Sequence, residues 1–275
     1  MLEHITRAPY YFEVHLLYAS LVWFAAWVLT SIPRGGATTK YWIWVATALN
    51  FIFPLGAVVD RFWTPHLSWA TPLSIIGDAA TRITRSPTAG VLCVVWLLGA
   101  TLMFTRLCLR IRAERRDAQA MAGQNPREPR RSFYAHGVPV RFAASRQAPA
   151  VDGVLRPYIS LPHGIDRVLS EHELNAVLIH ELIHARRRDN LIRLIHELAL
   201  CGLWFHPLVW ITGSRLALYR ERSCDEFVIQ RAHGGELVSA LAKLARSFRT
   251  ALTDGSSCRS ALRPGALLPE NVAQK

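Results

Sequence analysis

The residues best suited to chemistry in this sequence are the two histidines and the glutamate of the run His180-Glu-Leu-Ile-His184. A helix is predicted here, because Ser170 and Glu173 form an N-terminal capping box that is followed by regularly spaced leucines and a valine. Residues four apart on a helix face the same way, so both imidazoles can bind one metal ion, with Glu181 beside them. We interpret His180 and His184 as zinc ligands and Glu181 as the general base. Two helical histidines near a surface are the simpler alternative.

A second motif, Glu221-Arg-Ser-Cys-Asp225, lies on a predicted helix that runs from Arg215 towards Ile229. Glu221 would complete a set of two histidines and one glutamate, which leaves the fourth position of a catalytic zinc open. Asp225, one helical turn on, is expected to accept the N–H of a ligand imidazole and fix its tautomer. Cys224 could bind zinc as a thiolate, but a small buried residue beside the site is the preferred interpretation. Taken without the first motif, these charges would describe an ordinary solvated helix face.

Two further histidines are interpreted as structural. His196 is most simply explained by helical packing. His206 lies in the run Trp204-Phe-His-Pro207, which is typical of an aromatic turn at a membrane interface. Neither is predicted to bind the metal.

Three stretches of nineteen residues, 14–32, 41–59 and 87–105, contain no Asp, Glu, Lys or Arg. Nineteen helical residues extend about 28 Å, close to the thickness of the hydrocarbon core of a bilayer. Aromatic residues such as Tyr10 and Trp63 lie near their ends, as in interfacial belts. The sequence therefore predicts three transmembrane helices, and the first is too long for the core of a cleaved signal peptide. Buried core helices of a soluble protein are the alternative.

Arginine clusters after the third predicted span, where ten lie between residues 106 and 146. Because positive flanks stay in the cytoplasm, we expect the N-terminus outside and the remainder of the chain at the cytoplasmic face of a bacterial inner membrane. The net charge of +12 is explained by attraction to anionic lipid, so no nucleic acid partner is expected. Disulfides are not expected among the five cysteines on that side or in the spans.

The domain organisation follows from these features. Residues 1–110 form the transmembrane region, 111–131 a basic juxtamembrane linker interrupted by glycine and proline, 132–250 a metal-binding domain and 251–275 a polar tail. Short strands are predicted between residues 132 and 162, before the first metal-binding helix. Residues 191–213 are apolar but broken by charges, which favours a helix that lies against the membrane and returns at Pro207 over a fourth span; the choice stays open.

Three motifs, at residues 180–190, 204–210 and 220–226, make the sequence similar to the BlaR/MecR antirepressor family of integral-membrane gluzincin metallopeptidases. A looser match covers residues 148–162. The resemblance implies a mostly α membrane protein with a cytoplasmic α+β zincin-like domain. It also implies one zinc per chain bound by His180, His184 and Glu221, with Glu181 as general base and Asp225 in support.

The resemblance further implies signal transduction in which a regulatory protein, commonly a transcriptional repressor, is cleaved. Full-length receptors of the family continue into an extracellular penicillin-binding sensor, whereas this sequence ends at Lys275 in a polar tail, so β-lactam sensing is not assigned. We expect hydrolysis in which Glu181 takes a proton from the attacking water, and an extended substrate that pairs with a strand near Val151 to Leu161. The expected partners are a protein or peptide substrate and the bilayer, and a homodimer is left open.

Two other functions remain alternatives. The chain could be a latent or non-catalytic zinc-binding signalling protein, although Glu181, which is not a ligand, favours catalysis. It could also be an HtpX-like quality-control protease of the membrane. Substrate breadth separates the latter, because a regulator cleaves one partner and a quality-control protease many.

Overall fold

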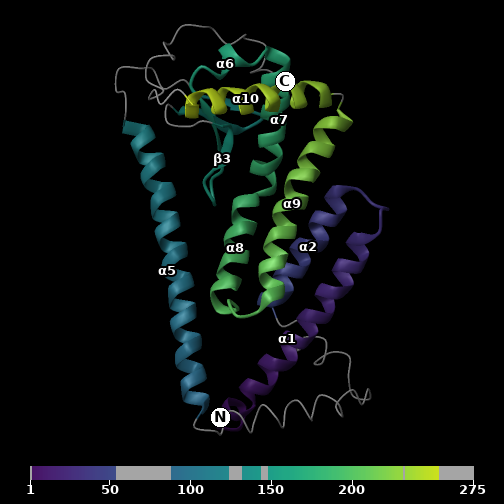
Figure 1. The fold of residues 1–275 in the computed structure, drawn as a ribbon, viewed down its shortest axis with the longest axis vertical. Helices are drawn as coiled ribbons and strands as arrows, with labels where there is room; N and C mark the ends of the chain where they lie inside the picture. The colour runs from purple at the N-terminus through teal and green to yellow at the C-terminus, as the bar shows by residue number, and fades with distance from the viewer. Residues whose placement is uncertain (1, 54–87, 124–131, 144–147, 232, 254–275) are drawn as a thin grey trace. The chain divides into compact units, whose positions relative to one another are not determined.

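The computed structural model describes residues 2–53, 88–123, 132–143, 148–231 and 233–253, which are mostly helical with one small sheet (Figure 1). They form two compact units. Unit one takes its described residues from Met1–Arg110 and Ile195–Tyr219, and unit two from Ile111–Leu194 and Arg220–Lys275. The predicted metal-binding domain at residues 132–250 is therefore interrupted, because residues 195–219 group with the N-terminal helices.

In unit one, α1 (Leu2–Ser31) and α2 (Ala37–Ile52) lie side by side, the two purple helices of Figure 1. The rings of Trp23 and Trp44 meet at 5.7 Å between their centroids, and Ala19 and Ala26 are buried on the same side of α1. The opposite side of α1 exposes large apolar residues such as Leu21 and Val28. The apolar part of α1, His15–Ser31, is shorter than the helix that a membrane span requires.

The second predicted span, residues 41–59, is described only as far as Phe53. Helix α2 ends at Ile52, and Phe53 has an extended backbone (φ −99°, ψ 120°). Pro54 follows in the sequence, and a residue before proline disfavours the helical conformation. The rest of this predicted span, residues 54–59, lies outside the described residues.

Helix α5 (Thr88–Gly123) contains the third predicted span and extends well beyond it. Among the residues that the structure describes, Gly90–Arg116 is the one helical stretch long and apolar enough to cross a membrane, and only 6% of its apolar window is buried. The predicted linker at 111–131 begins as part of this helix, which continues to Gly123. Residues 113–122 are mostly Ala, Glu, Arg, Gln and Met, which favour helix strongly enough to carry it past the span.

Helices α8 (Asp189–Gly202) and α9 (Pro207–Gln230) contain the segment predicted at 191–213, and the predicted return at Pro207 matches the start of α9. The chain turns between them just before Pro207, whose fixed φ suits the first position of a helix. Within unit one, His196 of α8 lies 3.0 Å from the carbonyl oxygen of Val209 in α9. A Cβ on Gly213 would come within 2.7 Å of the His196 ring, so glycine allows this close packing.

The sheet of unit two confirms the short strands predicted between residues 132 and 162. It contains β1 (Ser132–Ala135), β2 (Val138–Ala143), β3 (Ala150–Asp152) and β4 (Tyr158–Pro162), in the order β1-β2-β4-β3. Strands β2 and β4 are parallel, and the outer pairs are antiparallel. The strand expected from Val151 to Leu161 is thus two strands, β3 and β4, separated by a turn that begins at Gly153 with φ 81°. Of these two strands, β3 lies at an edge of the sheet and β4 lies inside it.

Helix α7 (Glu171–Arg187) follows the short helix α6 (Ile165–Val168) and packs on the sheet and on α10 (Gly234–Thr253). The predicted capping box is confirmed, because Ser170 Oγ accepts from the Glu173 N–H and the Glu173 carboxylate accepts from the Ser170 N–H. Apolar residues spaced three and four apart turn one face of α7 inward. The core that they share with the sheet and α10 includes Val140, Ile159, Leu161, Leu174, Val177, Leu178, Leu182, Leu237, Ala240 and Leu244.

Candidate metal centre

Helix α7 presents His180, Glu181 and His184 beside its apolar face. Each helical residue advances the direction of its side chain by about 100°, so residues 180, 181 and 184 lie on the flank of the stripe formed by Leu174, Leu178 and Leu182. Packing of that stripe in the core of unit two fixes the rotation of α7 and therefore the direction of the histidines. His184 is buried and His180 is partly buried.

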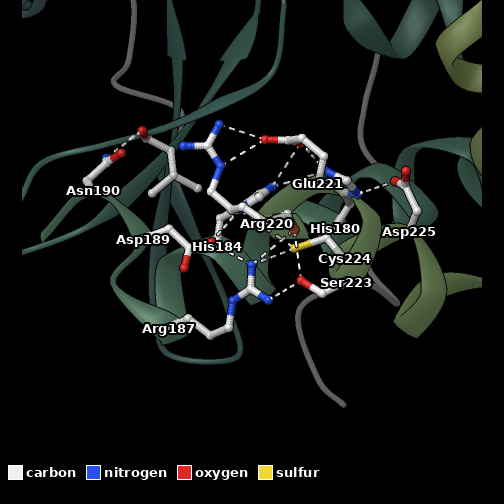
Figure 2. A network of polar contacts seen from close by, with 11 residues as sticks. His180, His184, Arg187, Asp189, Asn190, Arg220, Glu221, Ser223, Cys224 and Asp225 are labelled. Carbon is white, nitrogen blue, oxygen red and sulfur yellow. Dashed lines mark hydrogen bonds and ion pairs between the residues drawn. The ribbon is translucent and has the colours of Figure 1, made fainter. Parts of the chain in front are cut away.

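The second helix, α9, brings Glu221 to the two imidazoles (Figure 2). His180 Nε2 and His184 Nε2 lie 3.1 Å apart, and Glu221 Oε2 lies 3.7 Å from the first and 3.6 Å from the second. Tetrahedral zinc with bonds of about 2.0–2.1 Å separates its ligand atoms by about 3.3 Å. The three predicted ligands therefore converge at the spacing that one zinc ion requires.

Asp189, which the sequence analysis missed, lies 2.7 Å from Nδ1 of His184 and is buried. A carboxylate at Nδ1 holds the proton on that nitrogen, so Nε2 keeps its lone pair. Two Nε2 lone pairs cannot face each other at 3.1 Å unless a proton or a cation lies between them. The donor set thus fits a metal ion by its chemistry as well as by its spacing.

Electrostatics at His184 and Glu221 favour positive charge in the same place. Burial lowers the pKa of His184, but hydrogen bonds to Asp189, Cys224 and Glu221 outweigh it and raise that pKa to about 11. Burial opposes the ionisation of Glu221, yet hydrogen bonds from His180 and His184 hold the pKa of this carboxyl well below its usual range. Arg220 Nη2 donates to Glu221 Oε1 at 2.7 Å, so Oε2 is left directed at the imidazoles.

Asp225 lies on α9 one turn after Glu221 and approaches His180. Its Oδ1 is 3.2 Å from His180 Nδ1, without the geometry of a hydrogen bond. The side chain of Asp225 is 43% exposed, against 3% for Asp189. The two histidines therefore have similar partners in different surroundings.

Cys224 lies beside the His184 ring, on its Nδ1 side. Its Sγ is 3.6 Å from His184 Nδ1, the nitrogen that also contacts Asp189. The ligand atoms of His180, His184 and Cys224 lie within 4.8 Å of one another, a group that could hold a metal. Glu221 is the better third ligand, because its oxygen faces both Nε2 atoms, whereas the thiol faces the occupied Nδ1.

Glu181 adds a partly buried carboxyl to this centre. Burial raises its pKa, and the neighbouring His184 and His180 lower it in part. A carboxyl with a raised pKa beside a metal centre is suited to accept and return a proton near neutral pH.

Asp189 was missed because it lies where the helical spacing of α7 ends. Arg188 closes α7 in the left-handed conformation (φ 55°), which is uncommon for a residue other than glycine and turns Asp189 back towards His184. The helical spacing of three or four residues therefore does not predict that Asp189 lies near His184. The signal in the sequence is an acid directly after three consecutive arginines, five residues after His184.

His196 and His206 take part in other contacts, both within unit one. His196 is buried against Val209, as described above. His206 Nε2 lies 3.3 Å from Ser20 Oγ, and its ring packs edge-on against Phe51. These contacts agree with the structural interpretation of both residues.

Most of the chain, including the residues of the metal centre, matches one protein family. A family model described as BlaR1 peptidase M56 matches residues 12–237. The regulatory protein BlaR1 of Bacillus licheniformis is 30% identical over 177 residues, which cover 60% of this chain and 28% of that protein. Methicillin resistance mecR1 proteins of Staphylococcus aureus and Staphylococcus epidermidis are each 22% identical over 98 residues, covering 36% of this chain and 17% of theirs. The chain thus matches less than a third of the length of these relatives.

Proposed function

The chain belongs to the BlaR1 peptidase M56 family, and from this membership and the geometry of the metal centre we propose that it is a membrane-bound zinc metalloendopeptidase. One observation carries the proposal. His180 Nε2, His184 Nε2 and Glu221 Oε2 lie 3.1 to 3.7 Å from one another on two helices, next to the partly buried carboxyl of Glu181. A structural metal site would not require that carboxyl.

In this proposal His180, His184 and Glu221 hold one zinc ion, and Asp189 and Asp225 orient the imidazoles. Bound zinc supplies a Lewis acid that polarises the scissile carbonyl. Glu181 takes a proton from the water that attacks the peptide carbon and returns it to the departing amine. The raised pKa of Glu181 suits both steps, because a carboxylate whose acid form has a low pKa binds a proton only weakly.

The proposed substrate is an extended segment of a protein that lies along β3. This strand is at the edge of the sheet, and the Asn190 amide donates to its Val151 carbonyl at 2.9 Å and to the Gly153 carbonyl at 3.2 Å. Asn190 follows Asp189, so β3 is tied to the turn that holds His184. Strand addition at this edge would present a peptide backbone along the site.

A regulatory protein such as a transcriptional repressor is the proposed target. This rests on the relatives, which are named as a regulatory protein and as methicillin resistance proteins. Cleavage of one partner in signal transduction distinguishes this role from that of a quality-control protease, which would cleave many damaged proteins.

The proposed location is a bacterial inner membrane crossed three times, with the N-terminus outside and the metal centre at the cytoplasmic face. The apolar stretch of α5 and the arginines after it support this arrangement. Reporter fusions at Pro33, Pro72 and Lys275 test it. A periplasmic signal from the Lys275 fusion would contradict the proposed topology.

The function is tested by measuring metal content and proteolysis together on the purified, detergent-solubilised chain. We expect one zinc per chain, lost in His184→Ala and retained in Glu181→Gln, while Glu181→Gln cleaves about 10²–10⁴-fold more slowly because the general base is missing. His172→Ala and Glu171→Gln are matched controls, since both residues lie exposed in the first turn of α7 and should leave zinc and cleavage unchanged. A wild type that binds no zinc refutes the proposal. Zinc without cleavage of any candidate repressor supports a latent signalling role instead.

A further inference from the structure

Arg187 is the last residue of α7, which carries His180 and His184, and its side chain contacts α9, which carries Glu221. Its side chain is only 13% exposed. The guanidinium donates to Asp189 Oδ2 at 2.6 Å and, on α9, to Ser223 Oγ at 2.5 Å and Cys224 Sγ at 3.1 Å. Figure 2 shows it below the metal centre, between the Asp189 and Ser223 side chains.

The contact with Asp189 acts on His184. Arg187 Nη2 and His184 Nδ1 both bind the same oxygen, Oδ2, of the buried Asp189 carboxylate. A buried carboxylate is costly unless its charge is compensated, and the guanidinium provides a full positive charge at 2.6 Å. Arg187 therefore balances the charge of the Asp189 carboxylate and fixes it in the position from which it orients the imidazole.

The contacts with α9 act on Glu221. Arg187 reaches Ser223 Oγ, the carbonyl oxygen of Arg220 at 3.3 Å and Cys224 Sγ, which lie on both sides of Glu221 in the sequence. Ser223 in turn donates to the same Arg220 carbonyl at 2.9 Å. The guanidinium thus holds the turn of α9 from which Glu221 points at the two histidines.

We propose that Arg187 is a positioning residue of the metal centre, which sets the distance between the histidines of α7 and Glu221 of α9 while it fixes the partner of His184. The inference rests on the proposed function and adds a residue to it that binds neither metal nor substrate. The planar fork of arginine is essential in this role, because it directs several N–H groups to α8 and α9 at once. Lysine keeps the charge but offers a single nitrogen on a flexible stem.

The test compares Arg187→Lys with Arg186→Lys, a change at the neighbouring exposed arginine, in the full-length chain. Three measurements are made: zinc affinity by chelator competition, the visible spectrum of the cobalt-substituted protein, and kcat and KM of peptide cleavage. We expect Arg187→Lys to bind zinc about 10–100-fold more weakly, as other changes to residues that support ligands do. Its cobalt spectrum should be altered and kcat reduced with KM nearly unchanged, whereas Arg186→Lys should match the wild type.

Ser223→Ala provides a second variant if Arg187→Lys fails to fold. It removes one hydrogen bond of the guanidinium on α9, leaves the charge beside Asp189, and should weaken zinc binding severalfold with the same direction of spectral change. Wild-type zinc affinity and cobalt spectrum in folded Arg187→Lys, or in Ser223→Ala when the first variant does not fold, would overturn the inference.

Failure of this inference is distinguishable from failure of the proposed function. If the wild type binds no zinc, the proposed function fails. If the wild type binds zinc and cleaves peptide while Arg187→Lys behaves in the same way, the metallopeptidase stands and only the role of Arg187 is refuted.

Discussion

His184 and His180 each have a carboxylate near Nδ1, but the two pairs occupy opposite sides of the metal centre. On the inner side, Asp189 is 3% exposed and lies 2.7 Å from His184. On the outer side, Asp225 is 43% exposed and lies 3.2 Å from His180 without hydrogen-bond geometry. On the inner side the Arg187 guanidinium also binds the Asp189 oxygen that contacts His184.

The difference in exposure indicates that the inner side of the metal centre is more rigid than the outer side. An inner carboxylate with two buried partners fixes the tautomer and the rotation of His184 as part of the fold. An outer carboxylate in contact with solvent is screened and can change rotamer at small cost. We therefore expect the inner half to be formed before metal binds, and the outer half to gain its order when metal binds.

Asp189→Asn breaks the inner pair and has the largest expected effect. The substitution keeps the shape but removes the charge that holds the proton on His184 Nδ1, so zinc affinity should fall about 10–100-fold. Chelator competition on the purified chain measures this. An affinity within twofold of the wild type would mean that the buried pair does not orient the ligand.

Asp225→Asn makes the same change on the outer side and has a smaller expected effect. Because the pair is half exposed and its contact is longer, zinc affinity should fall by a factor of about two to five. The same competition assay ranks the two variants. A loss equal to that of Asp189→Asn would show that burial does not distinguish the two sides.

The candidate residues that the sequence analysis selected and the structure brings together are those that follow the repeat of a helix. His180 and His184 are four apart, as are Glu221 and Asp225, so helical geometry alone places each pair on one face. Which helices meet is decided by tertiary packing, and there the prediction depended on the resemblance to a family. Asp189 escaped because a left-handed residue, Arg188, separates it from the helix.

The fold was predicted best where a local signal is strong. The capping box at Ser170 marks the start of α7, and the strands between 132 and 162 are bounded by glycine and proline. The end of α5 was predicted less well, because charged residues that suit a linker are also good helix formers. The grouping of residues 195–219 with the N-terminal helices depends on long-range contacts that no local pattern contains.

Glu173 lies at the other end of α7. It tests whether the expected difference between Asp189 and Asp225 arises at the metal centre or from the anchoring of the whole helix. Its carboxylate accepts from Lys243 Nζ at 2.7 Å, from Ser239 Oγ and from the Ser170 N–H, which lowers its pKa from 4.5 to about 2. Because the folded-state pKa is depressed, the stability that Glu173 provides is present above about pH 4.5 and is lost as the pH falls towards 2.

Glu173→Gln should therefore lower the thermal midpoint at pH 7 by a few degrees, about 2–4 °C, and make it less sensitive to acid than that of the wild type. Glu171→Gln, at an exposed position in the same turn, is the control. Residue 173 lies eleven residues before His184, about 16 Å along the helix, so zinc affinity should not change. If Glu173→Gln weakened zinc as much as Asp189→Asn, the order of the inner half would depend on the anchoring of the whole helix to α10 and not on the buried pair.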